Sequence, residues 1–290
     1  MKVQRYGDAE DVLRACTPSL LAMEAENNLF LGLLAGLVAG TTASNGPPYL
    51  AAVVEGDKVL GAALMTPPHN LVLARCRSAE VLSLLARDVR TGSRPVPGVL
   101  AEKATAELFC AVWEEQTGER AELTKAERIY ELSEVLPVHG VSGAIRPARA
   151  DDRDLLVAWT AAFMEEAGAT QGDFREAAEW SVRGRLAARP NEGGLFLWDD
   201  GGAVALAGYS GPTPTGIRVG PVYTPPPLRG RGYASALVAA LSQALLAGGR
   251  QRCFLFTDLA NPTSNKIYQQ IGYVSVCDAD QYAFAGPSAR

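Results

Sequence analysis

The sequence contains few of the histidine and cysteine residues that hold zinc and similar metal ions. It has only two histidines, His69 and His139, among 290 residues, and neither stands in an H-E-x-x-H spacing. Its five cysteines are widely spaced and include no C-x-x-C pair, so neither a zinc site nor a redox dithiol is indicated. An odd number of scattered cysteines is typical of a reducing compartment. We therefore expect a cytoplasmic protein without a metal centre.

The chain also lacks an excess of positive charge and a long apolar run. Lys and Arg number 27 against 32 Asp and Glu, a formal net charge of −5, so no broad surface for nucleic acid is indicated. The apolar part of the charge-free stretch, residues 29–40, is shorter than the roughly 20 residues that a bilayer requires. No apolar segment follows the first residues as in a secretory signal. We expect neither nucleic acid nor a membrane as a partner.

A repeated pattern of elements indicates two domains of similar build. The length of 290 residues and the 48% hydrophobic content favour two globular domains. Apolar runs at 49–54 and 58–64 flank one turn, and runs at 195–198 and 203–209 flank another, so each half contains a predicted hairpin. Gly61 and Gly208 occupy equivalent places and lie 147 positions apart (208 − 61), about half of the chain. This spacing is typical of a duplicated domain.

The elements around the two hairpins follow one order. Helical sequence at 10–37 and at 151–188 precedes them. A strand, a helix, a strand, a helix and a strand pair then follow: in the first half 70–74, 79–89, 98–101, 104–116, 120–124 and 129–132, and in the second half 216–224, 230–247, 252–257, 263–271, 273–277 and 281–285. We predict an α/β (α+β) fold with domains at 1–136 and 143–290, joined by a Pro- and Gly-containing linker.

The strongest candidate site is a glycine-rich turn between a predicted strand and a long apolar helix. Residues 222–235 read VYTPPPLRGRGYAS. Gly230 and Gly232 allow the backbone to approach a ligand closely, and the helix N-terminus presents unpaired N–H groups. Arg229 and Arg231 add positive charge that a diphosphate could use. The pattern predicts a pyrophosphate cradle; the alternative is a turn that only caps the helix.

Three other nucleotide or hydrolase motifs do not fit the sequence. No G-x-x-x-x-G-K-S/T run is present, so a P-loop for nucleoside triphosphates is not supported. Ser235 stands where a dinucleotide-binding G-x-G-x-x-G would need its last glycine, and no acidic residue follows about 20 positions later. Residues 208–212 approach G-x-S-x-G, but Pro212 replaces the final glycine, which disfavours an α/β-hydrolase triad.

Two separated motifs in the second half occur in the order of one known family. Arg229, Gly232 and Ala234 fit R/Q-x-x-G-x-G/A, and residues 261–273 fit N-x6-Y-x3-G-F/Y. On these motifs the chain resembles the GNAT N-acetyltransferase superfamily over about residues 144–284. The resemblance implies two tandem GNAT-like domains, each a mixed, mostly antiparallel sheet flanked by helices. It further implies that strands 216–224 and 252–257 splay apart.

The resemblance implies an acyl-CoA-dependent N-acyltransferase. Acetyl-CoA would be the co-substrate, and a primary amine on a small molecule or a protein would attack its acyl carbonyl directly, with a strand N–H polarising that carbonyl. Tyr268 matches the family's general acid for the departing CoA thiolate; packing within the helix is its alternative role. The residues that match the cofactor-binding positions are Val222, Tyr223, Thr224, Arg229, Gly230, Arg231, Gly232, Tyr233, Ala234, Ser235, Asn261 and Asn265.

Several assignments stay open at the level of sequence. Candidates for the general base are Glu165, Glu166, Asp173 and Tyr209, and a water relay is equally compatible. The competing functions are a non-catalytic acyl-CoA-binding regulatory module and an O-acyl or longer-chain acyltransferase. The residues do not indicate the acceptor, the acyl chain length or the oligomeric state.

The first half lacks the cradle of the second. Residues 74–80 read ARCRSAE without a glycine, and Glu114 stands where the second half has Tyr268. We therefore expect the first half to be a degenerate domain that binds no CoA. It would complete the sheet or shape the acceptor site.

Overall fold

The computed structural model describes residues 1–92, 94–168 and 173–286, and the chain forms two compact units. Unit 1 comprises Met1–Ile129, Asp258–Ala260 and the segment from Val276 onward, and unit 2 comprises Tyr130–Thr257 and Asn261–Ser275. The chain therefore passes between the units more than once. The predicted domains, 1–136 and 143–290, are continuous stretches of sequence, whereas the compact units are discontinuous. The boundary at 137–142 therefore stays a prediction about where the sequence repeats.

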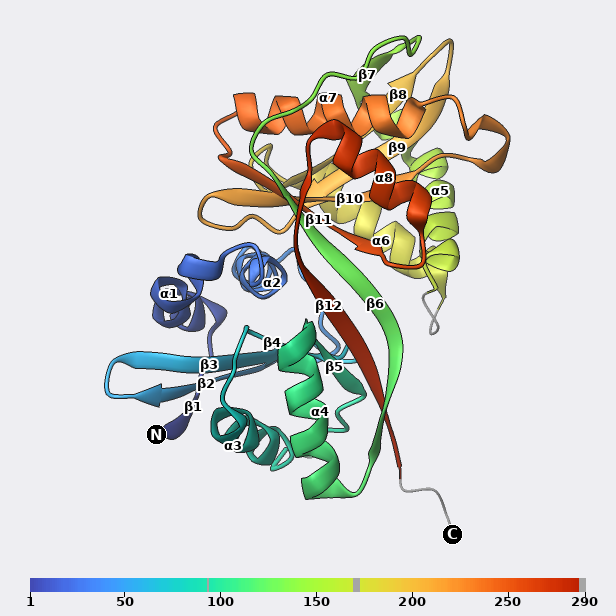
Figure 1. Cartoon of the computed structure of the whole chain (residues 1–290). Coiled ribbons are helices and arrows are strands. Elements are labelled where there is room, and N and C mark those ends of the chain that lie inside the picture. Colours follow the sequence, from blue (N-terminus) through green and yellow to red (C-terminus); the bar gives the residue numbers. More distant parts are fainter. Residues whose placement is uncertain (93, 169–172, 287–290) are drawn as a thin grey trace. The chain divides into compact units, whose positions relative to one another are not determined.

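Unit 1 is built on a mixed sheet with the strand order β1-β2-β3-β4-β5-β12-β6. Strands β4 and β5 are parallel, whereas β1–β2, β2–β3, β3–β4 and β5–β12 are antiparallel pairs. Its elements, shown in Figure 1, are β1 (Lys2–Arg5), α1 (Ala9–Leu20), η1 (Leu21–Met23), α2 (Asn28–Val38), β2 (Tyr49–Glu55), β3 (Lys58–Met65), β4 (Leu71–Leu73), α3 (Ala79–Val89), β5 (Gly98–Glu102), α4 (Lys103–Thr117), and parts of β6 (Arg120–Leu132) and β12 (Val274–Ala285).

Helices cover both faces of the strands in unit 1. Successive side chains of a strand point to opposite faces, and along β2 Ala51 and Val53 pack in the cluster of α3 and α4. Their neighbours Leu50 and Ala52 pack in the cluster of α1 and α2. Because both faces are buried, β2 is apolar at successive positions from Tyr49 to Val54 rather than at every second one, and only Glu55 at its end is charged.

Unit 2 repeats this architecture with the strand order β6-β11-β10-β9-β8-β7. Strands β10 and β11 are parallel, and β7–β8, β8–β9 and β9–β10 are antiparallel. The elements are β7 (Ala144–Pro147), η2 (Ala150–Asp152), α5 (Arg153–Glu166), α6 (Phe174–Ala187), β8 (Gly193–Asp199), β9 (Ala203–Ser210), β10 (Gly216–Tyr223), η3 (Pro226–Leu228), α7 (Tyr233–Ala247), β11 (Arg252–Asp258) and α8 (Pro262–Ile271). The predicted α/β fold, with mixed, mostly antiparallel strand pairing flanked by helices, is confirmed; the strands of the two units follow one 12-stranded order rather than forming two separate sheets.

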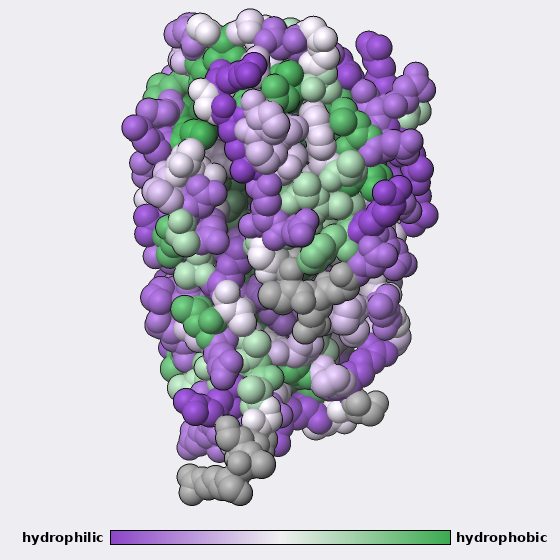
Figure 2. Space-filling model, turned by 90° about the vertical axis from the view of Figure 1, so that its right-hand side faces the viewer, coloured by the Kyte–Doolittle hydropathy of each residue, from purple (hydrophilic) through white to green (hydrophobic). Residues whose placement is uncertain are grey.

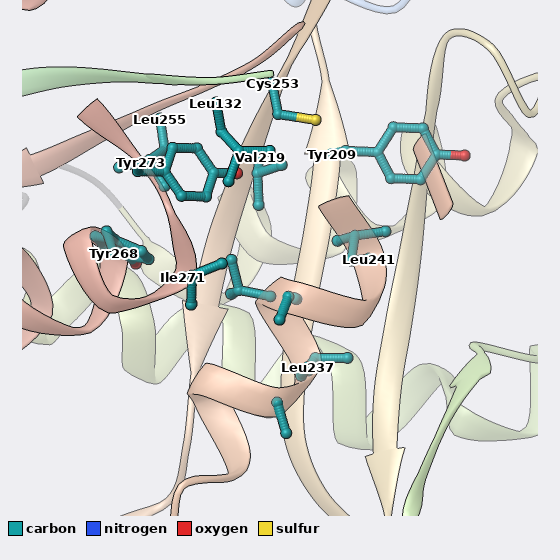
Figure 3. Packing of buried hydrophobic residues seen from close by; sticks show 14 of the residues in the cluster. Leu132, Tyr209, Val219, Leu237, Leu241, Cys253, Leu255, Tyr268, Ile271 and Tyr273 are labelled. Carbon is teal, nitrogen blue, oxygen red and sulfur yellow. The ribbon is translucent and has the colours of Figure 1, made fainter. Parts of the chain in front are cut away.

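The two faces of the unit 2 sheet carry different helix pairs. Ala205 and Ala207 of β9 lie in the cluster formed with α7 and α8, whereas Leu206 lies in the cluster formed with α5 and α6. Figure 3 shows the first cluster, with Leu237 and Leu241 of α7 beside the strands. The alternation on β9 thus fixes which face receives each helix pair.

The predicted strand pairs at 120–124 with 129–132 and at 273–277 with 281–285 are wrong. Each is one continuous strand, β6 and β12. Neither segment contains Gly, Pro or Asn, and the turn-favouring Asp278 and Asp280 are used in ion pairs along β12. The charged residues in between are held by ion pairs instead: Arg128 Nε lies 2.7 Å from Asp278 Oδ1, and Lys103 Nζ lies 2.9 Å from Asp280 Oδ2.

The other predicted elements are found within a few residues of their expected positions, and β1 and β7 are additional. No helix in the described part of the chain is long and apolar enough to cross a membrane. In Figure 2 hydrophilic residues cover most of the face shown, with apolar residues in small groups between them.

Candidate functional site

Strands β10 and β11 of unit 2 are paired only where they begin. Their parallel ladder joins Gly216, Ile217 and Arg218 to Arg252, Cys253 and Phe254, and no later pair is formed in the described residues. On its other side β10 pairs with β9 through an irregularity between Val219 and Val222. Such a bulge turns a strand away from its neighbour. The later backbone groups of β10 on the β11 side are therefore free to bond a ligand.

The turn after β10 leaves the N-terminus of α7 open. Gly230 and Gly232 have φ of 79° and 81°, a left-handed conformation that glycine adopts without steric cost. Gly232 is the N-cap and has no side chain to accept a hydrogen bond. The first intrahelical bond runs from Ala236 N to Gly232 O, at 3.0 Å, so the three preceding N–H groups have no intrahelical partner. These donors and the helix dipole form a ready anion site.

The equivalent helix of unit 1 is closed by its own side chain. Ser78 precedes α3, and its Oγ accepts a hydrogen bond from Val81 N at 3.3 Å. Glu114 accepts a bond from Ala121 N at 2.8 Å and so holds the end of α4 against the start of β6. Ser78 thus occupies one of the first N–H groups of α3, whereas the first N–H groups of α7 have no such acceptor among the described residues. Glu114, in the place of Tyr268, is used within the fold.

Thr224 follows β10 directly and carries a buried hydroxyl. Its Oγ1 has no hydrogen-bond partner in the described residues. Buried polar atoms without a partner are uncommon and call for an explanation, such as a ligand. Val222 and Tyr223, the residues before it, end the strand on the β9 side.

Arg229 braces the turn rather than facing the open helix end. Its Nε donates to Thr224 O at 2.9 Å, and its Nη2 lies 2.6 Å from Glu166 Oε2. The guanidinium also lies 5.7 Å from the centre of the Tyr223 ring. Arg229 thus ties the turn to the end of α5, and Arg231, which is exposed, carries the remaining positive charge of the turn.

Tyr233 and the linker before β7 support the start of α7 from the other side. Tyr233 donates from its hydroxyl to Asp200 Oδ2 at 2.7 Å, and Ser142 Oγ donates to the same oxygen at 2.8 Å. These two bonds, with a smaller contribution from Arg231, hold the pKa of Asp200 below its ordinary value. The Tyr233 side chain is therefore structural, and its backbone N–H is one of the three that have no intrahelical partner.

The two asparagines of the second motif organise helix α8. Asn261 Oδ1 accepts from Ser264 N at 3.0 Å, so this side chain caps the helix. Asn265 Nδ2 donates to Asn261 O at 2.8 Å, and Tyr130 donates from its hydroxyl to Asn265 Oδ1 at 3.0 Å. Both predicted cofactor-binding asparagines thus have structural partners in unit 2.

Tyr268 lies on α8 with a buried ring, whose centre is 6.5 Å from that of Tyr130 and 5.9 Å from that of Tyr273. Figure 3 shows Tyr268 and Tyr273. Burial raises the pKa of its phenol to about 12, so the group keeps its proton at neutral pH. Its hydroxyl makes no hydrogen bond to any described residue. The side chain therefore carries a proton that it can offer to a ligand.

The family comparison agrees with this geometry. Residues 154–273 match the acetyltransferase (GNAT) family. The chain carries a GNAT domain. The matched residues include β10, the open end of α7 and helix α8, so the two motifs and the splayed strands all lie within the GNAT domain. Among curated proteins, none matches the sequence.

Solved structures resemble the chain along nearly its whole length. A tandem GNAT protein from the clavulanic acid biosynthesis pathway has a TM-score of 0.60 at 14% identity, covering 100% of this chain and 99% of that one. A GCN5-related N-acetyltransferase from Kribbella flavida has a TM-score of 0.57 at 18% identity, covering 87% of this chain and 94% of that one. Another, from Sphaerobacter thermophilus, has a TM-score of 0.55 at 16% identity, covering 97% of this chain and 94% of that one. At these identities the likeness concerns the fold, which is that of tandem GNAT proteins.

Three of the four candidate bases of the GNAT domain have structural partners. Glu166 pairs with Arg229. Asp173 caps α6 by accepting from Arg175 N at 2.8 Å, and Tyr209 donates from its hydroxyl to Pro190 O at 2.7 Å. Glu165 is exposed at the end of α5.

Two arginines that the motifs do not mark lie together in the GNAT domain. Arg218 stands in β10 between the apolar residues Ile217 and Val219, and Arg185 reaches it from α6. The one sequence signal was a charged residue inside an otherwise apolar strand. Its partner across 33 positions (218 − 185) could be found only in three dimensions.

Proposed function

We propose that the GNAT domain transfers an acyl group, in the simplest case acetyl, from acetyl-CoA to a primary amine. The observation that carries this proposal is the uncapped N-terminus of α7, which follows a strand that has parted from its parallel neighbour. The N–H groups of Tyr233, Ala234 and Ser235 bind the diphosphate of the co-substrate. Gly230, where an added β-carbon would meet nothing within 4 Å, leaves the approach to them open, and the left-handed Gly232 turns the chain into the helix.

The residues at the end of β10 hold the pantetheine arm. Backbone groups of Val222, Tyr223 and Thr224 bond its amides, and the buried Thr224 hydroxyl gains the partner that it lacks. A backbone N–H of the bulged part of β10 polarises the acyl carbonyl. The amine attacks that carbonyl directly, a tetrahedral intermediate forms, and the carbon–sulfur bond breaks as Tyr268 donates a hydrogen bond to the departing thiolate.

The proton of the attacking amine leaves through water in this proposal. Three of the four candidate bases are occupied by structural bonds, and Glu165 is exposed. A small-molecule or protein amine is the acceptor. The five cysteines are all free thiols, which suits a reducing, cytoplasmic setting.

Charge placed at the open helix end tests the proposal. Ala234→Asp puts a carboxylate in the first turn of α7, where it suits the helix dipole but repels a diphosphate; Ala234→Asn has nearly the same shape without the charge. We expect calorimetry to show acetyl-CoA binding to the wild type, about 30-fold weaker binding for the Asp variant and a change of less than about fivefold for the Asn variant.

The outcomes separate the possible functions. Failure of the wild type to bind acetyl-CoA, or equal binding by the Asp variant, would refute the proposed site. Binding without release of free thiol over a panel of amines would favour the non-catalytic regulatory module. Release with a hydroxyl acceptor, or only with a longer acyl chain, would identify the O-acyl or longer-chain alternatives.

A further inference from the structure

Arg218 points to the α5–α6 face of the sheet in unit 2. Its neighbours Ile217 and Val219 pack in the cluster with α7 and α8, and strand alternation sends the residue between them to the opposite face. There its guanidinium lies against the turn after β9: a β-carbon on Gly211 would be 3.0 Å from Arg218 Nη2. The Nη1 atom of Arg218 is buried.

Arg185 brings a second guanidinium to the same place from α6. Its Nη2 donates to Ser210 Oγ at 3.2 Å, and its Nη1 donates to the hydroxyl of Ser181. Ser210 is the direct cross-strand partner of Arg218. The Nε of Arg185 is buried and has no hydrogen-bond acceptor in the described residues. The two cations therefore share one small region of the α5–α6 face.

The surroundings of Arg185 do not balance its charge. Its hydrogen-bond partners in the part of the chain that the structure describes are hydroxyl and carbonyl oxygens, none of them a carboxylate. Burial and the nearby charge of Arg218 lower its pKa to about 10. Buried charged groups are normally paired, because an uncompensated charge in the interior is costly. Arg185, which has an unused N–H donor and lies beside a second cation, is thus suited to an anion.

The position of this arginine pair relates it to the proposed reaction. Arg218 is the last residue of the β10–β11 ladder, and the irregular part of β10 that holds the acyl carbonyl in the proposed function begins one residue later and ends at Val222. At about 3.3 Å per residue, one to four residues correspond to roughly 3–13 Å. A small acceptor can span that distance between its amine and a second group.

We propose that Arg185 and Arg218 bind an anionic oxygen group, a carboxylate or a phosphate, on the acceptor amine. This inference rests on the proposed acyl transfer. Guanidinium groups recognise both anions through paired N–H donors, and the free Nε of Arg185 supplies one of them. The acceptor is then a small molecule with an amine and an anion within about 13 Å of each other, rather than a polyamine or a neutral amine.

Matched amines and matched variants test the inference. The amines are 3-aminopropanoate against propylamine, and 2-aminoethyl phosphate against ethanolamine, so that each pair differs in the anionic group. Arg185→Met removes one cation of the pair, and Arg218→Gln is a second variant should the first fail to fold. Arg183→Met removes the same charge from an exposed position of α6 and serves as the control. Acetyl-CoA binding is measured separately on every protein.

We expect the wild type to prefer one anionic amine over its neutral counterpart by about 100-fold in kcat/KM. Arg185→Met and Arg218→Gln should lose most of that preference by slowing only the anionic substrate, with acetyl-CoA affinity unchanged, and Arg183→Met should behave as the wild type. Which anionic amine reacts faster distinguishes a carboxylate from a phosphate acceptor.

Equal rates for charged and neutral amines in a wild type that binds acetyl-CoA would overturn this inference and leave the proposed function standing. The same holds if both arginine variants keep the preference. A wild type that binds no acetyl-CoA would refute the proposed function, and the acceptor assignment with it.

Discussion

Replacing Tyr268 by Phe removes one hydroxyl and leaves the ring between Tyr130 and Tyr273. Because that hydroxyl makes no hydrogen bond within the described residues, the fold loses little; we expect the free energy of unfolding to change by less than about 0.5 kcal/mol. Acyl transfer should slow because the departing thiolate loses a donor. The expected effect therefore lies in kcat and not in stability.

The size of that effect follows from two pKa values. Burial raises the pKa of Tyr268 to about 12, whereas an alkyl thiol has a pKa of about 8.5, so complete proton transfer would be uphill by about 5 kcal/mol. Tyr268 therefore acts as a hydrogen-bond donor to the thiolate. A hydrogen bond to a charged group contributes about 1.5–3 kcal/mol, so kcat should fall about 10- to 150-fold.

The assay follows free thiol release at saturating acetyl-CoA and acceptor. Tyr273→Phe is a matched control, since it removes the buried bond between Tyr273 and Ser242, at 2.8 Å. This variant should lose about 1–2 kcal/mol of stability and keep its kcat. Because the pKa of Tyr268 is raised, its phenol stays neutral through pH 10, so the wild type should show no basic limb from this group below about pH 11. An unchanged kcat in Tyr268→Phe, or an equal loss in the control, would refute the reasoning.

Three further predictions concern stability and the candidate base. Glu166→Gln should keep kcat within about threefold, because the carboxylate that it replaces is paired with Arg229. A kcat about 100-fold lower than that of the wild type across the pH profile would restore Glu166 as the base. Lys103→Met leaves the Asp280 carboxylate, which is 1% exposed, without its cation; urea titration should show a loss of about 2 kcal/mol, less than for a fully buried pair. A fragment of residues 143–290 should fail to fold, because it lacks β5 and β6; a monomeric fragment with a cooperative melt would contradict this.

Local patterns in the sequence predicted much of the fold. Helix α3 has its predicted bounds of 79–89, and both hairpins form where apolar runs flank a turn. The turn at Gly230 and Gly232 lies at the start of a helix, as expected from its glycines. Each of these features depends on residues that are close together in the chain, so a short window contains the information.

Features that depend on distant partners could not be predicted in this way. The charged segment around Asp278 and Asp280 predicts a break, whereas Arg128 and Lys103 stabilise it as part of a strand. Asn265 and Tyr130 form a hydrogen bond across 135 positions. Pairings of this kind arise from the fold as a whole, and no local periodicity records them.

The pairing of β12 with β5 has a consequence for the synthesis of the protein. Glu102 of β5 lies opposite Ala279 of β12, so 177 residues (279 − 102) must be added to the chain after Glu102 before its partner residue exists. At about 5–20 residues per second this takes about 9–35 s. During that time the N-terminal half has an open strand edge that invites chaperone binding or aggregation. A nonsense mutation near the 3′ end of the gene would therefore remove β12, the strand that pairs with β5 of the N-terminal half.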